Sequence, residues 1–385
     1  MARATCHAFL GLGCVASTGA SVHAAEWSIG PTFAVGTDDD NNRLLSSPAI
    51  GAASTWVFSN VQFQRSTEVT QITITPQVQW QHFDAKEFGD IVNRNLSASF
   101  LWTQERGSLN LTAARLDDST LTTELTETGI ASSDVHSLTD RTALSWNYGL
   151  AERRAFVLQA AYIDLTYYGR EVGYLALLEG YRYLTGSAGE QFNLSERTTL
   201  TASGFGDELI APLAINDSHE EGGELQLIHN FSERMVLNVT VGGSARSLEG
   251  ERSTGTVANV TFTRSSELGS VALNYSRQLT PYGTGVLADR QQISLTGTYN
   301  LTEKLDLNAS LLRIENSQSV VYLRLDRRSY TGLNCGLDWR PLEPWRLRLE
   351  GGTTRTQTFD AVSIPVTEWR VALSLTWTPH PLIWP

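Results

Sequence analysis

Apolar and polar residues alternate with a period of two along most of the chain. In the segments 72–80, 292–299, 305–313 and 369–377, one face is aliphatic or aromatic and the other carries Gln, Asn, Ser, Thr or charged residues. Such alternation is typical of half-buried β-strands. Strands of soluble proteins usually have five or six residues, whereas these segments have about nine or more, the length a tilted strand needs to cross a bilayer. The pattern therefore predicts an all-β outer-membrane barrel with apolar side chains towards lipid and polar side chains towards a lumen.

A short turn motif of the type LxER separates these segments in pairs. It recurs as LAER at 150–153, LSER at 194–197, FSER at 231–234, SSEL at 265–268, LTEK at 301–304 and LEP at 342–344. The spacing between its glutamates (152, 196, 233, 267, 303 and 343) is 44, 37, 34, 36 and 40 residues. A repeat of this length indicates a repeated β-hairpin, and the short turns belong on the periplasmic side of a barrel.

The hairpins give eighteen predicted strands in an up-and-down antiparallel barrel. The approximate spans are 26–36, 53–63, 69–83, 94–104, 108–117, 140–150, 155–167, 179–191, 198–210, 222–231, 236–248, 255–265, 270–281, 290–301, 305–317, 327–340, 345–360 and 367–378. An even count brings both termini of the chain to one side of the membrane, and closure leaves no unpaired backbone in lipid. The alternative count is sixteen, because 179–191 is rich in glycine and 50–63 alternates poorly. Pro76 lies inside a strand and predicts a bulge.

The longer connections are predicted external loops, at 37–52, 118–139, 168–178, 211–221 and 282–289. The segment from Asp118 to Asp140 is the longest of them and mixes apolar residues with glutamates. Its Leu121, Glu124, Leu125 and Glu127 are candidates for a constriction, in which the glutamates would meet lumen arginines such as Arg348 or Arg370. Extension above the membrane and contact with a partner are the other readings.

Residues 1–24 have the features of an export signal: Arg3, an apolar and small middle, and Val22 and Ala24 before a cleavage site. We therefore expect the barrel domain to comprise residues 25–385. Cleavage would leave Cys335 as the one cysteine, so no intramolecular disulfide is expected. With no plug domain expected ahead of the first strand, any obstruction of the lumen has to come from a loop.

Composition narrows the class further. Only 18% of residues are charged, against roughly 25% in soluble domains, and no stretch beyond the N-terminus has 18 consecutive apolar residues. A helical membrane protein is therefore not expected. The formal net charge is −12, and Lys86 and Lys304 are the only lysines, so nucleic acid is not expected as a partner. The predicted location is the outer membrane of a Gram-negative cell, with lipid and lipopolysaccharide as partners and no cofactor.

Charged residues of the last strands fall on the polar face of the alternation. They are the pore-lining candidates Arg328, Asp338, Arg340, Arg346, Arg348, Glu350 and Arg370, together with Arg355. A charge facing lipid at mid-depth would cost roughly 2–4 kcal/mol, which favours a lumen position. Two readings remain: a salt-bridged network that stiffens the interior, and a cationic wall that selects anionic solutes.

Catalytic and metal sites have little support. His82-Phe83-Asp84 is the one local His–Asp hint, no GxSxG motif occurs, and no histidine pair has metal-ligand spacing. Asp38, Asp39 and Asp40 offer oxygen ligands, but Arg43 and Ala49 stand where a calcium loop needs glycine and glutamate. We expect these aspartates to lie in an acidic external loop.

The chain resembles a loose family of bacterial outer-membrane β-barrel proteins that occur with exopolysaccharide and exosortase-type loci. The likeness is carried by residues 36–42, by the phrase at 118–129 and by the repeated LxER turns, although three aspartates stand where the family has a single Asp-Asp-Asn. The resemblance implies an envelope location and a role in surface-polysaccharide export, with polysaccharide or its export machinery as partner.

Three functions follow as hypotheses. The first is a passive channel or a component of surface-polysaccharide export, since a barrel of about eighteen strands encloses a wide lumen. The second is a non-transporting scaffold with an obstructed lumen. The third, a barrel enzyme, has the least support. The sequence does not define the solute or the oligomeric state.

Overall fold

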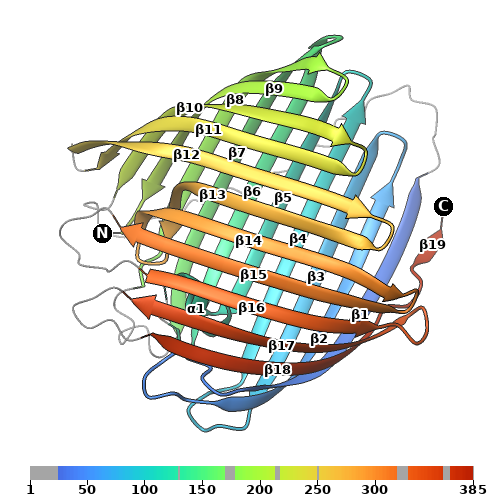
Figure 1. Ribbon diagram of the computed structural model, residues 1–385, viewed down its shortest axis with the longest axis vertical. Coiled ribbons are helices and arrows are strands. Elements are labelled where there is room, and N and C mark those ends of the chain that lie inside the picture. The colour runs from blue at the N-terminus through green and yellow to red at the C-terminus, as the bar shows by residue number, and fades with distance from the viewer. Residues whose placement is uncertain are drawn as a thin grey trace, which may run out of the picture.

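The chain forms a closed antiparallel β-barrel (Figure 1). The computed structural model describes residues 25–128, 131–169, 178–212, 217–248, 251–318, 328–358 and 365–384. The predicted signal segment 1–24 lies outside these ranges, so its role stays a prediction.

Eighteen long strands, one helix and one short terminal strand make up the described structure. In chain order they are β1 (Glu26–Asp40), β2 (Ala52–Ser66), β3 (Thr70–Phe83), β4 (Ile91–Gln104), β5 (Gly107–Ser119), α1 (Thr120–Glu127), β6 (Val135–Ala151), β7 (Arg154–Gly169), β8 (Tyr181–Ser195), β9 (Thr198–Ile210), β10 (Ser218–Ser232), β11 (Met235–Leu248), β12 (Glu251–Ser266), β13 (Gly269–Tyr282), β14 (Val286–Thr302), β15 (Leu305–Gln318), β16 (Arg328–Trp339), β17 (Trp345–Thr358), β18 (Val366–Trp377) and β19 (Leu382–Trp384).

Each long strand pairs with its neighbours in sequence, and β1 pairs with β18 to close the ring. The prediction of eighteen strands is confirmed, and the alternative of sixteen is wrong, because the segments with weak patterns form β2 and β8. Glycine at 186 and 189 does not break β8, since both neighbouring strands continue their pairing past these positions. Closure gives both edges of every long strand a neighbouring strand for backbone hydrogen bonding. The bilayer core requires this because it offers no water as a partner.

The seam between the first and last strands is irregular near the chain ends. β1 pairs with β18 from Phe33 opposite Trp377 up to Asp40 opposite Arg370. Nearer the chain ends, β19 pairs with Trp27 to Ile29. Between these two stretches, residues 378–381 lie opposite residues 30–32, so the terminal strand has one extra residue, as in a β-bulge.

Pro76 does not cause the predicted bulge. Asn60 pairs with Gln77 and Phe63 with Ile74 in one unchanged register, and only the pairs between them are missing from the ladder to β2. On its other side Pro76 pairs with Leu96 of β4. The missing N–H donor therefore interrupts one ladder locally without displacing the strand.

Apolar side chains cover the outside of the barrel. Leu349, Val371 and Trp369 are 49%, 58% and 63% exposed, as are many other large apolar residues along the strands. A soluble protein would not leave so continuous an apolar surface to water, whereas lipid accepts it. The helix α1 has eight residues, and no described helix is long and apolar enough to span a membrane.

The two ends of the barrel differ. The LxER motifs form the tight turns between β6 and β7, β8 and β9, β10 and β11, β12 and β13, and β14 and β15, and LEP lies between β16 and β17. These turns and the last strand share one end, and α1 lies inside the barrel at the opposite end (Figure 1). Strands extend further towards that end than predicted, since β1 continues to Asp40 and β5 to Ser119. Short turns mark the periplasmic side of bacterial barrels, so α1 lies towards the cell exterior.

Cysteine labelling tests the assignment of faces in β17. In a Cys335→Ser background, Arg346→Cys should react with a membrane-impermeant maleimide that reaches the lumen, whereas Leu347→Cys should react only with a lipid-soluble reagent. The reason is strict alternation: Leu347 pairs with Leu375 on the outer face, and Arg346 faces the lumen. Labelling of intact proteoliposomes measures this. The opposite pattern would mean that the register is displaced by one residue.

Candidate functional site

The helix α1 begins directly after β5 and is capped within the chain. The hydroxyl of Ser119 accepts a hydrogen bond from the backbone N–H of Leu121, and the backbone N–H of Thr128 donates to Glu124 at the other end. Threonine is a poor helix former, and the helix has only two turns. Contacts with the barrel wall therefore have to stabilise α1.

The first turn of α1 packs into an apolar cluster on the wall. Leu121 is buried with Ala52 of β2, Phe83 at the end of β3, Phe88 in the connection between β3 and β4, and Ile91 of β4. This contact holds the start of the helix against one side of the lumen.

The end of α1 reaches the opposite wall. Arg328 of β16 donates hydrogen bonds to the carbonyl oxygens of Leu125 (2.9 Å) and Glu127 (3.3 Å). The Tyr282 hydroxyl of β13 donates to the Glu127 carbonyl at 2.8 Å, and the Arg290 guanidinium of β14 forms an ion pair with the Glu127 carboxylate. In a ring of eighteen strands, β14 lies nine strands from β5 in either direction. The helix therefore crosses the lumen.

The predicted constriction segment thus folds inward, and neither extension above the membrane nor contact with a partner is needed to place its apolar residues. The expected partners of its glutamates were wrong, because Glu127 meets Arg290 and the backbone of α1 meets Arg328 rather than Arg348 or Arg370. The alternation of residues 286–302 in the sequence predicts that Arg290 faces inward. It does not predict that Arg290 and Glu127 lie at the same height along the barrel axis.

Glu124 lies on the face of α1 turned towards β7. Its carboxylate accepts hydrogen bonds from the Tyr167 hydroxyl at 2.7 Å and from the Thr128 hydroxyl at 3.0 Å. Burial raises the pKa of Glu124, and the nearby charge of Glu127 acts in the same direction, while these two hydrogen bonds and Arg328 act against them. This carboxyl group therefore holds its proton to higher pH than an exposed glutamate.

Cavities remain on both sides of α1. One, of about 420 Å³, lies between Leu121, Thr122, Leu125 and Thr126 and the wall formed by β1–β3 and β16–β18. The other, of about 440 Å³, lies between Glu124 and Glu127 and the wall formed by β5–β8, β13 and β14. The helix therefore leaves space on both sides rather than filling the lumen, and these two spaces are called passages below.

The pore-lining candidates of the last strands occupy several levels of one wall. Glu350 and Arg370 line the first passage together with α1, and Arg328 anchors the helix. Arg348 lies one inward position below Glu350 and pairs with it at 2.9 Å. Nearer the periplasmic end are Arg340, which pairs with Asp306, Asp338, which accepts a hydrogen bond from Asn308, and Arg346.

Arg355 was assigned wrongly to this wall. It alternates with Thr354, which lines the passage, and with the buried Thr356, so its side chain has the same orientation as Leu347 and Leu349. It lies near the external end of β17, where an outward charge is close to water and lipid headgroups.

The acidic segment does not form the expected external loop. Asp38 and Asp40 are buried residues of β1 that point inward, where Asp38 pairs with Arg43 and, at 3.2 Å, with Arg370. Arg43, which stands where a calcium loop would need glycine, turns back into the barrel mouth and stacks over Phe83. Within the described ranges, no group of three or more His, Cys, Asp or Glu residues could hold a metal ion.

The candidate catalytic histidine lies outside the barrel. His82 stacks on Trp80, which is exposed on the lipid-facing side, and its Nδ1 lies 2.7 Å from Asp90 rather than beside Asp84. Both members of the pair are about half exposed. This is the geometry of a solvent-exposed hydrogen-bonded pair at the rim.

Comparison with known proteins gives similarity of fold. No protein-family model matches the chain, and no match was found among curated proteins. Among solved structures, Pseudomonas aeruginosa OccK5 (OpdH) is similar with a TM-score of 0.50 and 10% identity, over 92% of this chain and 98% of that one. Acinetobacter baumannii OccAB3 gives 0.49 and 9% over 92% and 99%, and a mutant of the ferric enterobactin receptor PfeA of P. aeruginosa gives 0.45 and 8% over 91% and 80%.

The closed barrel, its lipid-facing exterior and this likeness of fold define the class of protein. The chain is an outer-membrane β-barrel protein of a Gram-negative bacterium.

The raised pKa of Glu124 predicts that α1 is held less firmly as pH rises. An acid whose pKa is raised in the docked state favours docking below the ordinary carboxyl pKa, and this advantage is lost as pH rises through the ordinary value towards the raised one. Amide hydrogen exchange of residues 120–127, corrected for intrinsic rates, should therefore become faster with pH in the wild type and should lose that dependence in Glu124→Gln. Identical pH profiles for the two proteins would contradict this assignment.

Proposed function

We propose that this protein is a passive outer-membrane channel in which α1 forms the constriction. The observation that carries the proposal is the helix itself, anchored on opposite walls and flanked by two passages. A constriction of this kind limits the size of the solutes that pass, and the side chains that line it determine which chemical classes of solute are selected.

The polar interior supports the same function. Inward positions of β2–β5 carry Gln, Asn, Ser and Thr over most of their length, as at Gln77, Gln79, Asn95 and Thr112. Such a lining is wetted by water, whereas a barrel whose interior serves only as a structural core is filled by packed side chains.

The scaffold with an obstructed lumen is the competing function, and the density of contacts on α1 favours it. Four groups, from β7, β13, β14 and β16, bind a segment of eight residues. If the passages beside the helix were too narrow for solutes, the same contacts would make α1 a plug. A role in surface-polysaccharide export rests on the family resemblance alone and stays a prediction.

Planar-bilayer recording separates the channel from the scaffold. The purified wild-type protein should show discrete conductance steps, and replacing residues 120–127 by a short Gly/Ser linker should raise the step size on the order of twofold or more, because the lumen of an eighteen-strand barrel is wide without a crossing segment.

The control is the double variant His82→Ala, Asp90→Ala, which removes a hydrogen-bonded pair from the outer rim and should leave the step unchanged. Heat-modifiable migration in gels verifies that each variant is a folded barrel. A silent wild-type barrel that conducts only after the helix is removed would favour the scaffold.

A further inference from the structure

We propose that the channel takes an uncharged, hydroxylated solute, a small saccharide, and that the passage between α1 and the wall of β1–β3 and β16–β18 recognises it. The inference rests on the channel function proposed above and adds the chemistry of the solute. It comes from the side chains that the solute would meet at two places in the lumen.

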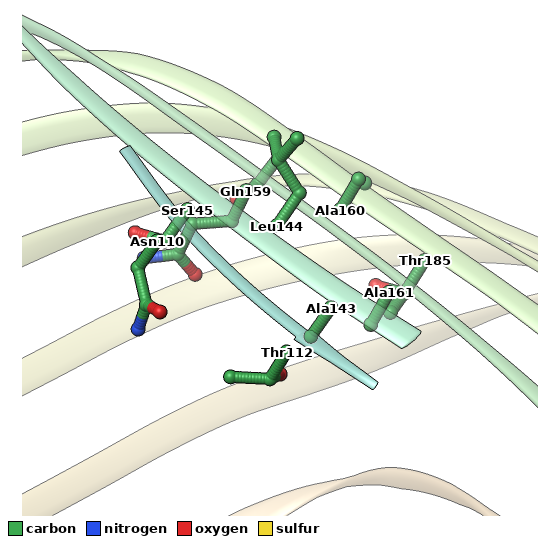
Figure 2. Close-up of a pocket in the computed structure, with 11 residues that line it drawn as sticks. Asn110, Thr112, Ala143, Leu144, Ser145, Gln159, Ala160, Ala161 and Thr185 are labelled. Atoms are coloured by element: carbon green, nitrogen blue, oxygen red, sulfur yellow. The ribbon is translucent and has the colours of Figure 1, made fainter. Parts of the chain in front are cut away.

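The first place is the inner wall formed by β5–β8. A hollow of about 330 Å³ there is lined by Asn110, Thr112, Ser145, Gln159, Thr185 and Ser187, with alanines, a leucine and a glycine between them (Figure 2). No ionisable side chain lines it. Amides and hydroxyls both donate and accept hydrogen bonds, which matches the hydroxyl groups of a sugar and gives an isolated charge no counter-ion.

The second place is the passage beside α1, where Trp56 forms an aromatic platform. Trp56 is directly opposite Gly36 in the β1–β2 pairing, and a Cβ at Gly36 would lie 2.5 Å from the indole ring. Because Gly36 has no side chain, the indole ring of Trp56 can lie over β1. Trp56 also lines the passage. A flat ring with one face on the wall is the surface on which the C–H face of a sugar packs.

Besides charged residues, which are treated below, the passage around this platform has neutral groups. Gln79 lies in the passage on β3, and Tyr330 and Asn334 line it from β16. The helix presents Thr122 and Leu125 to the same space. Its acidic face is turned the other way, towards Tyr167 and Arg290, so α1 brings no charge to this side.

The charges on this side are compensated, which argues against an ionic solute. Among the described residues, the wall of β15–β18 with β1 and its connection carries nearly as many inward arginines as carboxylates, namely Arg43, Arg328, Arg340, Arg346, Arg348 and Arg370 against Glu26, Asp38, Asp40, Asp306, Asp338, Glu350 and Glu368. Arg370 pairs with Asp38 and Arg348 with Glu350. Paired groups offer hydrogen bonds to hydroxyls, but they do not create the excess of one sign that selects ions.

Sugar block of the ion current tests the inference. Maltotriose added to one side of a bilayer that contains the full-length protein should reduce the current in a saturable way. Trigalacturonate, which has the same number of rings and three carboxylates, should require at least about tenfold more, because the carboxylates of the wall offset its arginines and leave no excess of positive charge to attract an anion. A polyethylene glycol of the same hydrodynamic radius should not give saturable block.

The Trp56→Leu variant should raise the half-blocking concentration of maltotriose by about fivefold, the scale of one aromatic contact. Its matched control is Trp80→Leu on the lipid-facing side of the adjacent strand, which should block like the wild type. If Trp56→Leu is not a heat-modifiable barrel, Gln79→Leu replaces it with the same expected direction.

The outcomes separate the two proposals. Absence of conductance would overturn the channel and this inference with it. Conductance with equal block by maltotriose and trigalacturonate, or block no better than that of the polyethylene glycol, would leave the channel standing and refute the saccharide. Unchanged block in the folded Trp56 and Gln79 variants would refute the assigned passage.

Discussion

Backbone hydrogen bonding in lipid is the constraint on which the whole structure depends. A strand exposed to hydrocarbon cannot exchange its N–H and C=O partners for water, so every long strand has to be paired on both edges. Closing the ring between β1 and β18 meets that requirement and fixes the rest. Alternation of side chains then sends one half of each strand towards lipid and the other half towards an enclosed space. Because the outside has to be apolar, the polar residues and most of the chemistry are directed into the lumen.

A polar lumen gives α1 its stability. In water an eight-residue helix rich in threonine would not persist, but inside the barrel its backbone carbonyls and carboxylates meet Arg328, Arg290 and the hydroxyls of Tyr167 and Tyr282. The apolar contact of Leu121 holds the other end. The charges of the neighbouring wall are arranged in pairs, so they stiffen the mouth while adding little net field. The same polar interior thus supports the constriction and leaves water-filled space beside it.

The fold could be predicted from the sequence because its signal is local. A period of two, strand length and the LxER turns are all visible within a few residues, and they gave the strand number and most strand positions. The site is different. Arg290 and Glu127 are 163 residues apart, and their contact depends on how far each strand rises and on the tilt of the barrel. Asp38 looked like part of a loop because charges are unexpected in a strand, and only its distant partner Arg370 shows why β1 continues through it. The alternation of residues predicted whether a side chain faces lipid or lumen. The height of that side chain along the barrel axis could be read only from the structure.

The irregular seam is the place where we expect the pairing of strands in the barrel to open first. Near the periplasmic end, Pro31, Pro379 and Pro381 contribute no N–H groups, and the bulge separates the short contact of β19 from the regular ladder above it. A closed sheet is expected to open first where the fewest hydrogen bonds join two neighbouring strands. We therefore expect β19 to separate from β1 first, and to pair with it last when the chain is inserted. The stacked rings of Phe33 and Trp377, 5.7 Å apart at the first regular pair, would be the point at which such an opening stops.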